Sequence, residues 1–259
     1  MTKPLWSIQL LAVGRSEIPG PELFWMRKWN EWLPLTFQVA LIRGKAGVLL
    51  VNTGPGRDLK PLNRGWEAFL GKRAALTRAD GEYVLDQLQR AGVGPKDITH
   101  VVLTPLQLYT LGNILEFANA RICIAERGWT HFHRTHTHPH DDRATSIPDE
   151  ILVPLVTSEW SRVWLLEDEA EILPGVRTWW TGGHHRASLC VDVDTRAGVV
   201  AIGDAFFYHE NLEENHPIGI SESVDECLAA YARVRRTADL AVPLYDPSNF
   251  ERYPLGRIG

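Results

Sequence analysis

Five short apolar segments of this chain each end in a turn that is rich in glycine, proline or polar residues. In chain order, these turns begin at Asn52, Thr104, Thr181, Gly203 and Leu244. Apolar runs of about four to eight residues between such breakers are typical of strands inside a sheet. In open α/β sheets, ligands bind beside the carboxyl ends of the strands. The pattern therefore predicts an α/β fold whose site is built by these turns.

The segments between the turns alternate between strand and helix patterns. Two apolar runs within 37–52 flank a glycine-containing turn, which predicts a β-hairpin. Asp80 caps a predicted helix that Gly92 ends and whose apolar face is formed by Val84, Leu85, Leu88 and Ala91. Ser223 with Glu226 forms a capping box for a helix to about residue 236. A helix is also predicted over 106–118, and strands over 98–103, 121–125, 176–181, 188–193, 198–202 and 240–244.

No fixed-period repeat or low-complexity linker divides the chain. We therefore expect a single domain over residues 1–259, with a His-rich loop at about 130–150. Cys123, Cys190 and Cys227 lie far apart in apolar segments, which predicts buried thiols. If residues 22–32 are helical, Trp25 and Trp29 share one face with Trp32, and we expect that face to pack on the core.

The charge and hydropathy patterns exclude several classes of partner. The chain has 27 Lys and Arg against 32 Asp and Glu, a net charge of −5, and no basic run. Nucleic acid and membrane surfaces are therefore not expected partners. No segment approaches the roughly 18 apolar residues of a membrane span, and the amino terminus lacks a secretory pattern, so we expect a cytoplasmic protein. The expected partner is a small-molecule substrate or ligand, and a homodimer is compatible with the sequence.

The order and spacing of the five turns resemble the metallo-β-lactamase superfamily, most closely its lactonase-like branch. The run Val-Gly-Pro-Lys-Asp-Ile-Thr-His-Val-Val-Leu-Thr over 93–104 is similar to the family's approach to its metal motif. Leu111-Gly112-Asn113 is similar to the exit from that motif. The resemblance implies an α/β fold in the form of a four-layer αββα sandwich, with two mixed β-sheets back to back and helices outside.

The positions that the resemblance implies as metal ligands mostly hold other residue types. In metal-binding members a His-x-His-x-Asp-His motif follows Thr104 and binds a pair of zinc ions. The four ligand positions of that motif are occupied here by Pro105, Gln107, Tyr109 and Thr110. Proline has no donor atom, glutamine offers a neutral amide, and a phenol with a pKa of about 10 is a poor zinc ligand at neutral pH. Tyr245 also replaces a histidine, and Asn52 replaces an aspartate. We therefore expect no metal and no cofactor.

Two of the implied ligand positions keep their residue type, namely His184 after Gly182-Gly183 and Asp204 in Gly203-Asp204-Ala205. Because the stretch 181–189 is shorter than the lactonase-like form, either His184 or His185 is able to face the pocket. One interpretation makes His184 a general base that Asp204 orients. The other makes the two residues a hydrogen-bonded pair that only holds two turns together.

The replaced positions provide the remaining candidate site residues. Tyr109 and Tyr245 are predicted on opposite sides of one pocket, where their hydroxyls are able to donate hydrogen bonds to a carbonyl or carboxylate oxygen. Filling the volume left by the cations is the alternative role. The predicted substrate-binding residues are Gln107, Thr110, His185 and Asn52.

The segment 130–142 holds half of the chain's ten histidines. If it folds over the pocket, one or two of these imidazoles would rebuild a mononuclear metal site with His184 and Asp204. A solvated loop is the alternative, because the spacing is not that of a helical zinc site.

Three functional hypotheses follow from these residues. The first is a metal-independent hydrolase or lyase that acts on a small acyl or carbonyl compound, with His184, Asp204, Tyr109 and Tyr245 as its catalytic residues. The second is a catalytically inactive ligand-binding or interaction protein with the same fold. The third is a mononuclear metallohydrolase that uses the His-rich segment.

Overall fold

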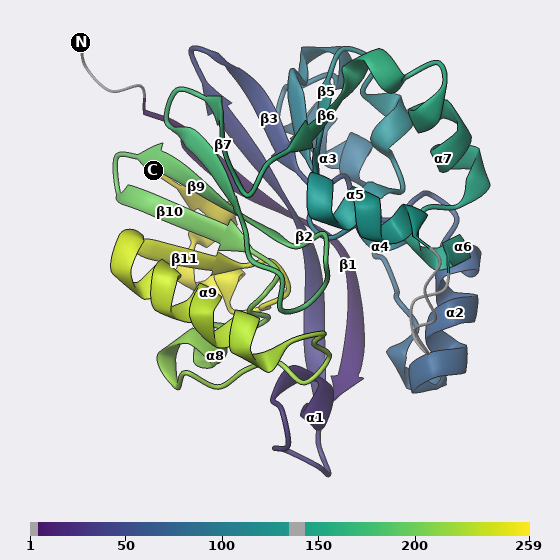
Figure 1. Cartoon of the computed structure of the whole chain (residues 1–259), viewed down its shortest axis with the longest axis vertical. Coiled ribbons are helices and arrows are strands. Elements are labelled where there is room, and N and C mark those ends of the chain that lie inside the picture. Colours follow the sequence, from purple (N-terminus) through teal and green to yellow (C-terminus); the bar gives the residue numbers. More distant parts are fainter. Residues whose placement is uncertain (1–4, 135–142) are drawn as a thin grey trace.

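The computed structural model describes residues 5–134 and 143–259. Its longest strands, β1 (Ser7–Pro19) and β2 (Trp32–Gly44), pair antiparallel and run down the middle of Figure 1. A tight turn connects β2 to β3 (Gly47–Val51), with which it also pairs antiparallel. The hairpin predicted over 37–52 is therefore confirmed.

Two mixed β-sheets are built around these strands. The first has seven strands in the order β12-β1-β2-β3-β4-β5-β6, with parallel pairing from β3 to β6. Its other members are β4 (His100–Val102), β5 (Arg121–Ala125), β6 (Val163–Leu166) and β12 (Arg257–Ile258). The second sheet has five strands in the order β11-β10-β9-β8-β7. Its members are β7 (Glu169–Leu173), β8 (Val176–Trp180), β9 (Leu189–Thr195), β10 (Gly198–Gly203) and β11 (Leu240–Pro243).

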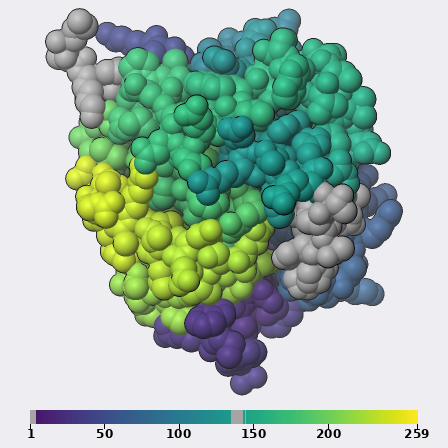
Figure 2. All heavy atoms as spheres, in the orientation of Figure 1, coloured from purple at the N-terminus to yellow at the C-terminus, as the bar shows by residue number. Residues whose placement is uncertain are grey.

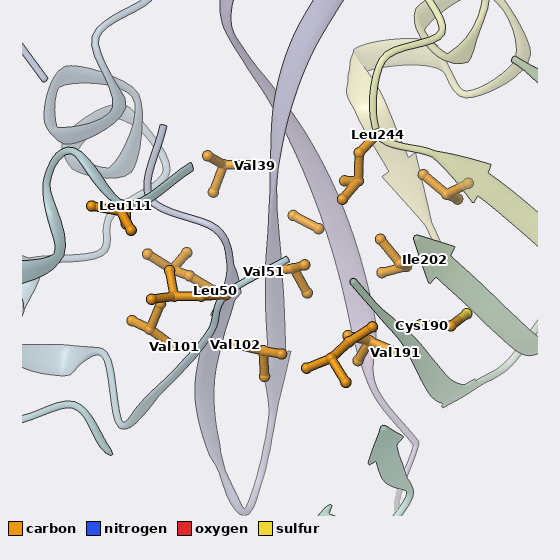
Figure 3. Close-up of a cluster of buried hydrophobic side chains, with 14 of the residues drawn as sticks. Val39, Leu50, Val51, Val101, Val102, Leu111, Cys190, Val191, Ile202 and Leu244 are labelled. Atoms are coloured by element: carbon orange, nitrogen blue, oxygen red, sulfur yellow. The ribbon is translucent and has the colours of Figure 1, made fainter. Parts of the chain in front are cut away.

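The two sheets pack face to face through apolar side chains. In Figure 3, Val51 and Val102 of the first sheet point toward Val191 and Ile202 of the second. Leu50 lies on the other side of β3, because successive side chains of a strand point to opposite faces. All five side chains are buried. Strands buried on both faces carry continuous apolar runs, which is why these strands are visible in the sequence.

Helices cover the outer faces of both sheets. Figure 1 shows α3 (Val84–Arg90), α5 (Glu126–His133) and α7 (Asp149–Val156) on the side of the seven-stranded sheet, and α8 (His209–Glu213) and α9 (Val224–Thr237) on the side of the five-stranded sheet. The other helices are α1 (Gly20–Leu23), α2 (Lys60–Leu70), α4 (Leu108–Leu111), α6 (Arg143–Ser146) and α10 (Asn249–Arg252). The predicted four-layer αββα sandwich is therefore confirmed. Within the described residues, no helix has the length and apolarity to cross a membrane.

Several local predictions are also confirmed. Ser223 caps α9, and its hydroxyl accepts a hydrogen bond from the backbone N–H of Glu226 at 3.3 Å. Gly92, with φ of +72°, follows the end of α3 in the left-handed conformation that glycine adopts without strain. The predicted start of this helix is wrong, because α3 begins at Val84 after Tyr83 and not after Asp80. The three cysteines are free and buried. That residues 1–259 form a single domain stays a prediction.

The helix predicted over 106–118 is wrong. The structure has instead α4 and a short 3₁₀ turn, Ile114–Glu116, with a break at Gly112 and Asn113. The backbones of Gly112 and Gly56 touch, and a Cβ at Gly112 would lie 2.3 Å from the Gly56 nitrogen. Asn113 Nδ2 lies 2.9 to 3.2 Å from three carbonyl oxygens in the turn after β3. These tertiary contacts override the local helix propensity.

The loop predicted over 130–150 is wrong at both of its ends. Helix α5 continues to His133, and α6 and α7 together occupy most of 143–156. The buried Trp129 and Phe132 anchor α5 at helical spacing, which the polar residues around them hide in the sequence. Residues 135–142, with three of the histidines of this segment, lie outside the described residues.

The apolar helical face expected within 22–32 is also wrong. Helix α1 ends at Leu23, and Trp25 and Trp29 are 47% and 63% exposed. Met26 and Lys28 have φ values of +59° and +55°, which no helix allows. This segment forms the lower tip of the molecule in Figure 1 and the dark purple projection in Figure 2.

Candidate active site

Asn52 ties together the turns that follow β3 and β4. Its Nδ2 donates to the carbonyl oxygen of Thr104 at 2.8 Å, and its Oδ1 accepts from the backbone N–H of Thr104 at 2.8 Å. Its φ of +66° lies in the left-handed region, where asparagine is enriched. Its side chain is buried, and both polar atoms of its amide bind the backbone of Thr104. The geometry favours a bracing role for Asn52 over the predicted contact with a substrate.

Asp204 stands at the centre of the strand ends, in the turn after β10, and is fully buried. Three side chains bind its carboxylate. Thr104 Oγ1 donates to Oδ1 at 2.5 Å, Ser188 Oγ donates to Oδ2 at 2.7 Å, and His184 Nδ1 lies 2.9 Å from Oδ2. A buried carboxylate is tolerated when it has such donors. Asp204 therefore joins the turns after β4, β8 and β10 into one polar cluster.

His184 is fixed by this carboxylate and opens onto a cavity. Because an ionised carboxylate only accepts hydrogen bonds, Nδ1 carries the proton of the neutral ring. Nε2 then presents its lone pair, and within the described residues no side chain hydrogen-bonds it. The ring packs edge-on against Phe207 at a centroid distance of 4.8 Å, and its side chain lines a large cavity. The contact with Asp204 therefore holds the ring in one tautomer and one orientation.

Two glycines before His184 set its position. Gly182 and Gly183 have φ values of +56° and +71°. A Cβ at Gly183 would lie 2.7 Å from the sulfur of Cys227. The backbone N–H of Gly183 donates to Glu226 Oε2 at 2.9 Å, which ties this turn to the first turn of α9. The Gly-Gly pair is therefore required by both conformation and close packing.

Tyr245 provides a buried hydroxyl without a hydrogen-bond partner. Its side chain is 3% exposed, and within the described residues its Oη is the one buried side-chain polar atom that lacks a hydrogen bond. Burial, with smaller contributions from Tyr109 and Asp204, raises the pKa of Tyr245 well above its usual value. The phenol therefore stays protonated at neutral pH and remains a hydrogen-bond donor. Leaving such a group unpaired costs about 1 to 3 kcal/mol, so a ligand atom that accepts its hydrogen bond would be stabilised.

Tyr109 and Tyr245 line the same cavity, but they belong to one aromatic wall and do not face each other from opposite sides of the pocket. Their ring centroids lie 6.3 Å apart, and Phe37 packs against both at 5.4 and 5.3 Å. Trp66 of α2 and Phe207 complete the wall, 5.6 Å from Tyr109 and 4.6 Å from Tyr245. The two tyrosines therefore fill volume beside His184, and donation of a hydrogen bond to a ligand stays a prediction.

The other predicted substrate-binding residues differ in whether they line the cavity. His185 lines the same cavity as His184, but its Nδ1 accepts from the backbone N–H of Ala187 at 3.2 Å. Its Nε2 lies 3.2 Å from Nε2 of Gln107, which also lines the cavity. Thr110 is buried, with its hydroxyl 2.6 Å from the carbonyl oxygen of Pro105. Both histidines therefore face the pocket, but Asp204 orients only His184, and Thr110 braces a turn.

The cavity has a volume of about 710 Å³, which is the size of a small-molecule site. The ends of β1 and β2, helix α2, the strand-end turns and the segment 219–222 contribute its lining. Three carboxylate residues line it, namely Glu17, Glu22 and Glu222. Within the described residues no lysine or arginine does.

Some of these residues were not found by the sequence reasoning. Thr104 and Ser188 bind Asp204. Thr104 begins one predicted site turn and Ser188 follows another, so position in the sequence was an available signal. Trp66 and the glutamates come from segments without a strand-end turn, and only the tertiary fold brings them to the cavity.

The described residues include no group of three or more His, Cys, Asp or Glu side chains placed to hold a metal ion. His131 and His133 lie in α5, and the other histidines of the His-rich segment lie outside the described residues. Whether that segment rebuilds a mononuclear site stays a hypothesis.

No model of a protein family matches this chain, and no curated protein matches it. Solved structures do match. An N-acyl homoserine lactone hydrolase, with N-hexanoyl-L-homoserine bound at its catalytic metal centre, is 18% identical over 97% of both chains, with a TM-score of 0.77. A probable metal-dependent hydrolase from Staphylococcus aureus is 15% identical over 95% of this chain and 91% of its own, with a TM-score of 0.72. A hydrolase of the beta lactamase superfamily is 13% identical over 99% and 92%, with a TM-score of 0.66. These likenesses confirm the resemblance at the level of the fold.

Proposed function

We propose that this chain, whose fold is that of the metallo-β-lactamase superfamily, is a metal-independent hydrolase or lyase that acts on a small acyl or carbonyl compound. One observation carries the proposal: an oriented histidine base, His184, and an unpartnered buried phenol, Tyr245, line the same cavity. Proton transfer beside a carbonyl group requires at least a base and a hydrogen-bond donor that line the same cavity.

In this proposal His184 is the general base. Its Nε2 accepts a proton either from a water molecule that attacks the carbonyl carbon or from the carbon next to it. Asp204 keeps the proton on Nδ1 and stabilises the imidazolium that forms, without being protonated itself. In hydrolysis the oxyanion then collapses and the bond to the leaving alcohol breaks, and in elimination the enolate expels the substituent on the next carbon; in both, the imidazolium gives its proton to the leaving group. A positioned base of this kind contributes about 10² to 10⁴ in rate.

Tyr245 is the electrophilic partner of this base. Negative charge develops on the carbonyl oxygen in both reactions, as an oxyanion when water attacks and as an enolate when the carbon loses its proton. The phenol of Tyr245 donates a hydrogen bond to that oxygen, and its high pKa keeps the proton on the phenol before reaction. Tyr109, beside it in the aromatic wall, positions the substrate.

The donor set of the cavity does not fit a pair of zinc ions. Each zinc ion takes about four ligands, drawn from imidazole, thiolate and carboxylate groups or water. Of the implied ligand positions only those of His184 and Asp204 carry such groups, and the oxygens of Asp204 already bind Thr104, Ser188 and His184. The ring of Tyr245 also packs edge-on to that of His184, with 6.3 Å between their centroids. Loss of the dinuclear site is therefore part of the proposal, as is a metal-free cytoplasmic enzyme without a nucleic-acid partner.

The test is a substrate screen with tag-free protein that has been treated with EDTA and exchanged into metal-free buffer. A panel of lactones, aryl esters and β-substituted carbonyl compounds covers both reaction types. We expect turnover that survives chelation and that His184→Ala lowers at least about 100-fold. His100→Ala is the matched control, because His100 lies at the start of β4 and contacts Thr99.

Two outcomes would contradict the proposal. Turnover that disappears on chelation and returns with zinc or manganese would favour a rebuilt metallohydrolase. Ligand binding without any turnover, unchanged in His184→Ala, would favour a catalytically inactive binding protein.

A further inference from the structure

The charged residues of the cavity are all acidic within the described residues, yet they are not equivalent. Glu17 is paired with Arg73, whose Nε and Nη2 donate to its carboxylate at 2.7 and 2.9 Å. Glu222 is paired with Arg186, which also binds Glu226. Both carboxylates therefore already have a cationic partner.

Glu22 differs from these two residues. It lies in α1, directly after the end of β1, and it lines the cavity half-buried. Its backbone carbonyl accepts hydrogen bonds from the N–H groups of Gly219 and Ile220 at 2.9 and 2.8 Å, which fixes the residue at the cavity wall. Within the described residues, however, no side chain or backbone donor binds its carboxylate. Burial without a partner raises the pKa of Glu22, because the charged form loses hydration and gains nothing in exchange.

We infer that the ligand of this cavity carries a cationic amine, which pairs with the carboxylate of Glu22. This inference rests on the proposed function and names its substrate class: a small acyl or carbonyl compound with an ammonium group. The unpartnered Tyr245 hydroxyl, buried in the same cavity, independently points to a ligand there.

The rest of the cavity suits the same chemistry. Its aromatic wall of Phe37, Trp66, Tyr109 and Phe207 offers ring faces that attract cations as well as apolar groups. The net charge of −5 favours the approach of a cation and disfavours an anion. A carboxylate-bearing ligand would instead meet the carboxylate of Glu22, which has no cationic partner among the described residues.

The test is calorimetric titration at neutral pH with three probes of one shape: 2-phenylethylamine, 2-phenylethanol and phenylacetate. We expect the amine to bind the wild-type protein about tenfold to 100-fold more tightly than the alcohol, because a hydrogen bond to a charged partner is stronger than one between neutral groups. Phenylacetate should bind most weakly. Equal affinities for the amine and the alcohol would overturn the inference without any variant.

Variants locate the effect. Glu22→Gln keeps the shape of the side chain and should reduce the preference for the amine to about onefold to twofold. Glu31→Gln is the matched control, because it changes the net charge equally at an exposed residue outside the cavity. Loss of the preference in Glu31→Gln as well, or its persistence in Glu22→Gln, would overturn the assignment to Glu22.

His184→Ala separates this inference from the proposed function. The variant should lose turnover but keep the preference for the amine, since Glu22 and His184 belong to different elements. If turnover depends on His184 but the wild-type protein does not prefer the amine, only the present inference fails. If the preference holds but His184→Ala turns over like the wild type, only the proposed function fails.

Discussion

The turns at the ends of the two sheets differ in how their polar groups are used. In the turns after β3 and β4, Asn52 and Asn113 satisfy neighbouring backbone groups, and little is left over for a ligand. In the turns after β8, β10 and β11, His184 keeps an open Nε2, and Tyr245 keeps an unpaired hydroxyl. Polar residues at strand ends therefore have two roles. In the proposed function, the base and the hydrogen-bond donor both come from turns of the five-stranded sheet.

The largest effect expected from this contrast is on catalysis. His184→Ala should lower turnover by about 10² to 10⁴, because the general base is removed. The free energy of unfolding should fall by only about 1 to 3 kcal/mol, because the Asp204 carboxylate loses one of its three donors, so the variant should stay folded. Steady-state rates and thermal melts of the same preparations measure both quantities. A large loss of stability with little loss of rate would mean that the histidine only holds two turns together.

The opposite result is expected at the other sheet. Asn52→Ala leaves the N–H and C=O of Thr104 without partners and places alanine at a φ of +66°. The free energy of unfolding should fall by about 3 kcal/mol, since each unpaired buried group costs about 1 to 3 kcal/mol. Urea denaturation checks this value. If Asn52→Ala is as stable as the wild type but binds substrate more weakly, Asn52 contacts the substrate as the sequence predicted and does not brace the turns.

Substitution of two buried tyrosines, Tyr245 and Tyr231, compares a hydroxyl assigned to a ligand with a hydroxyl that only stabilises the fold. Tyr245→Phe removes a hydroxyl without a hydrogen bond, so stability should be unchanged or slightly higher, while turnover falls about tenfold to 100-fold. Tyr231→Phe is the matched control, because its hydroxyl donates to the Ala205 carbonyl at 3.0 Å and accepts from Ile218 N–H at 3.3 Å. It should lower the free energy of unfolding by about 1 to 2 kcal/mol and leave turnover unchanged. Equal behaviour of the two variants would contradict the assignment of Tyr245 to a ligand.

The smallest expected effect is on the pH dependence of stability. It should change in opposite directions when Glu22 and Glu17 are substituted. Burial raises the pKa of Glu22 above 4.5, so its contribution to stability is present below pH 4.5 and is lost as the pH rises through the folded-state pKa. Arg73 holds the pKa of Glu17 below 4.5, so its contribution is present above pH 4.5 and is lost as the pH falls through its folded-state pKa. As the pH rises, Glu22→Gln should therefore gain stability relative to the wild type and Glu17→Gln should lose it. Thermal melts across this range measure the difference, and shifts of the same sign would show that Glu22 has a partner.

Much of the fold was predictable because its strands are buried on both faces. Strands β5 and β10 and the cap of α9 follow from apolar runs and capping residues, which act locally. The break at Gly112 was not predictable, because its cause is contact with Gly56 across the fold. The exposed segment that contains Trp25 was misjudged, because an aromatic residue signals burial only when the backbone allows it.

The candidate site was predictable in part for the same reason. His184, Asp204 and Tyr245 each follow a recognisable strand, so their convergence follows from topology. The role of Asn52 depends on which atoms it meets, and its residue type alone does not reveal this. Glu22 comes from a helix of four residues at the far end of β1, and only the folded chain brings it to the cavity.

The central claim is that the turns of the five-stranded sheet act as a base and a donor without a metal ion. Elemental analysis of tag-free protein, produced in zinc-supplemented medium and dialysed against metal-free buffer, tests it most directly. We predict far less than one transition-metal ion per chain in a preparation that is fully active. One or two tightly held ions per chain, reduced in His184→Ala and required for turnover, would contradict it.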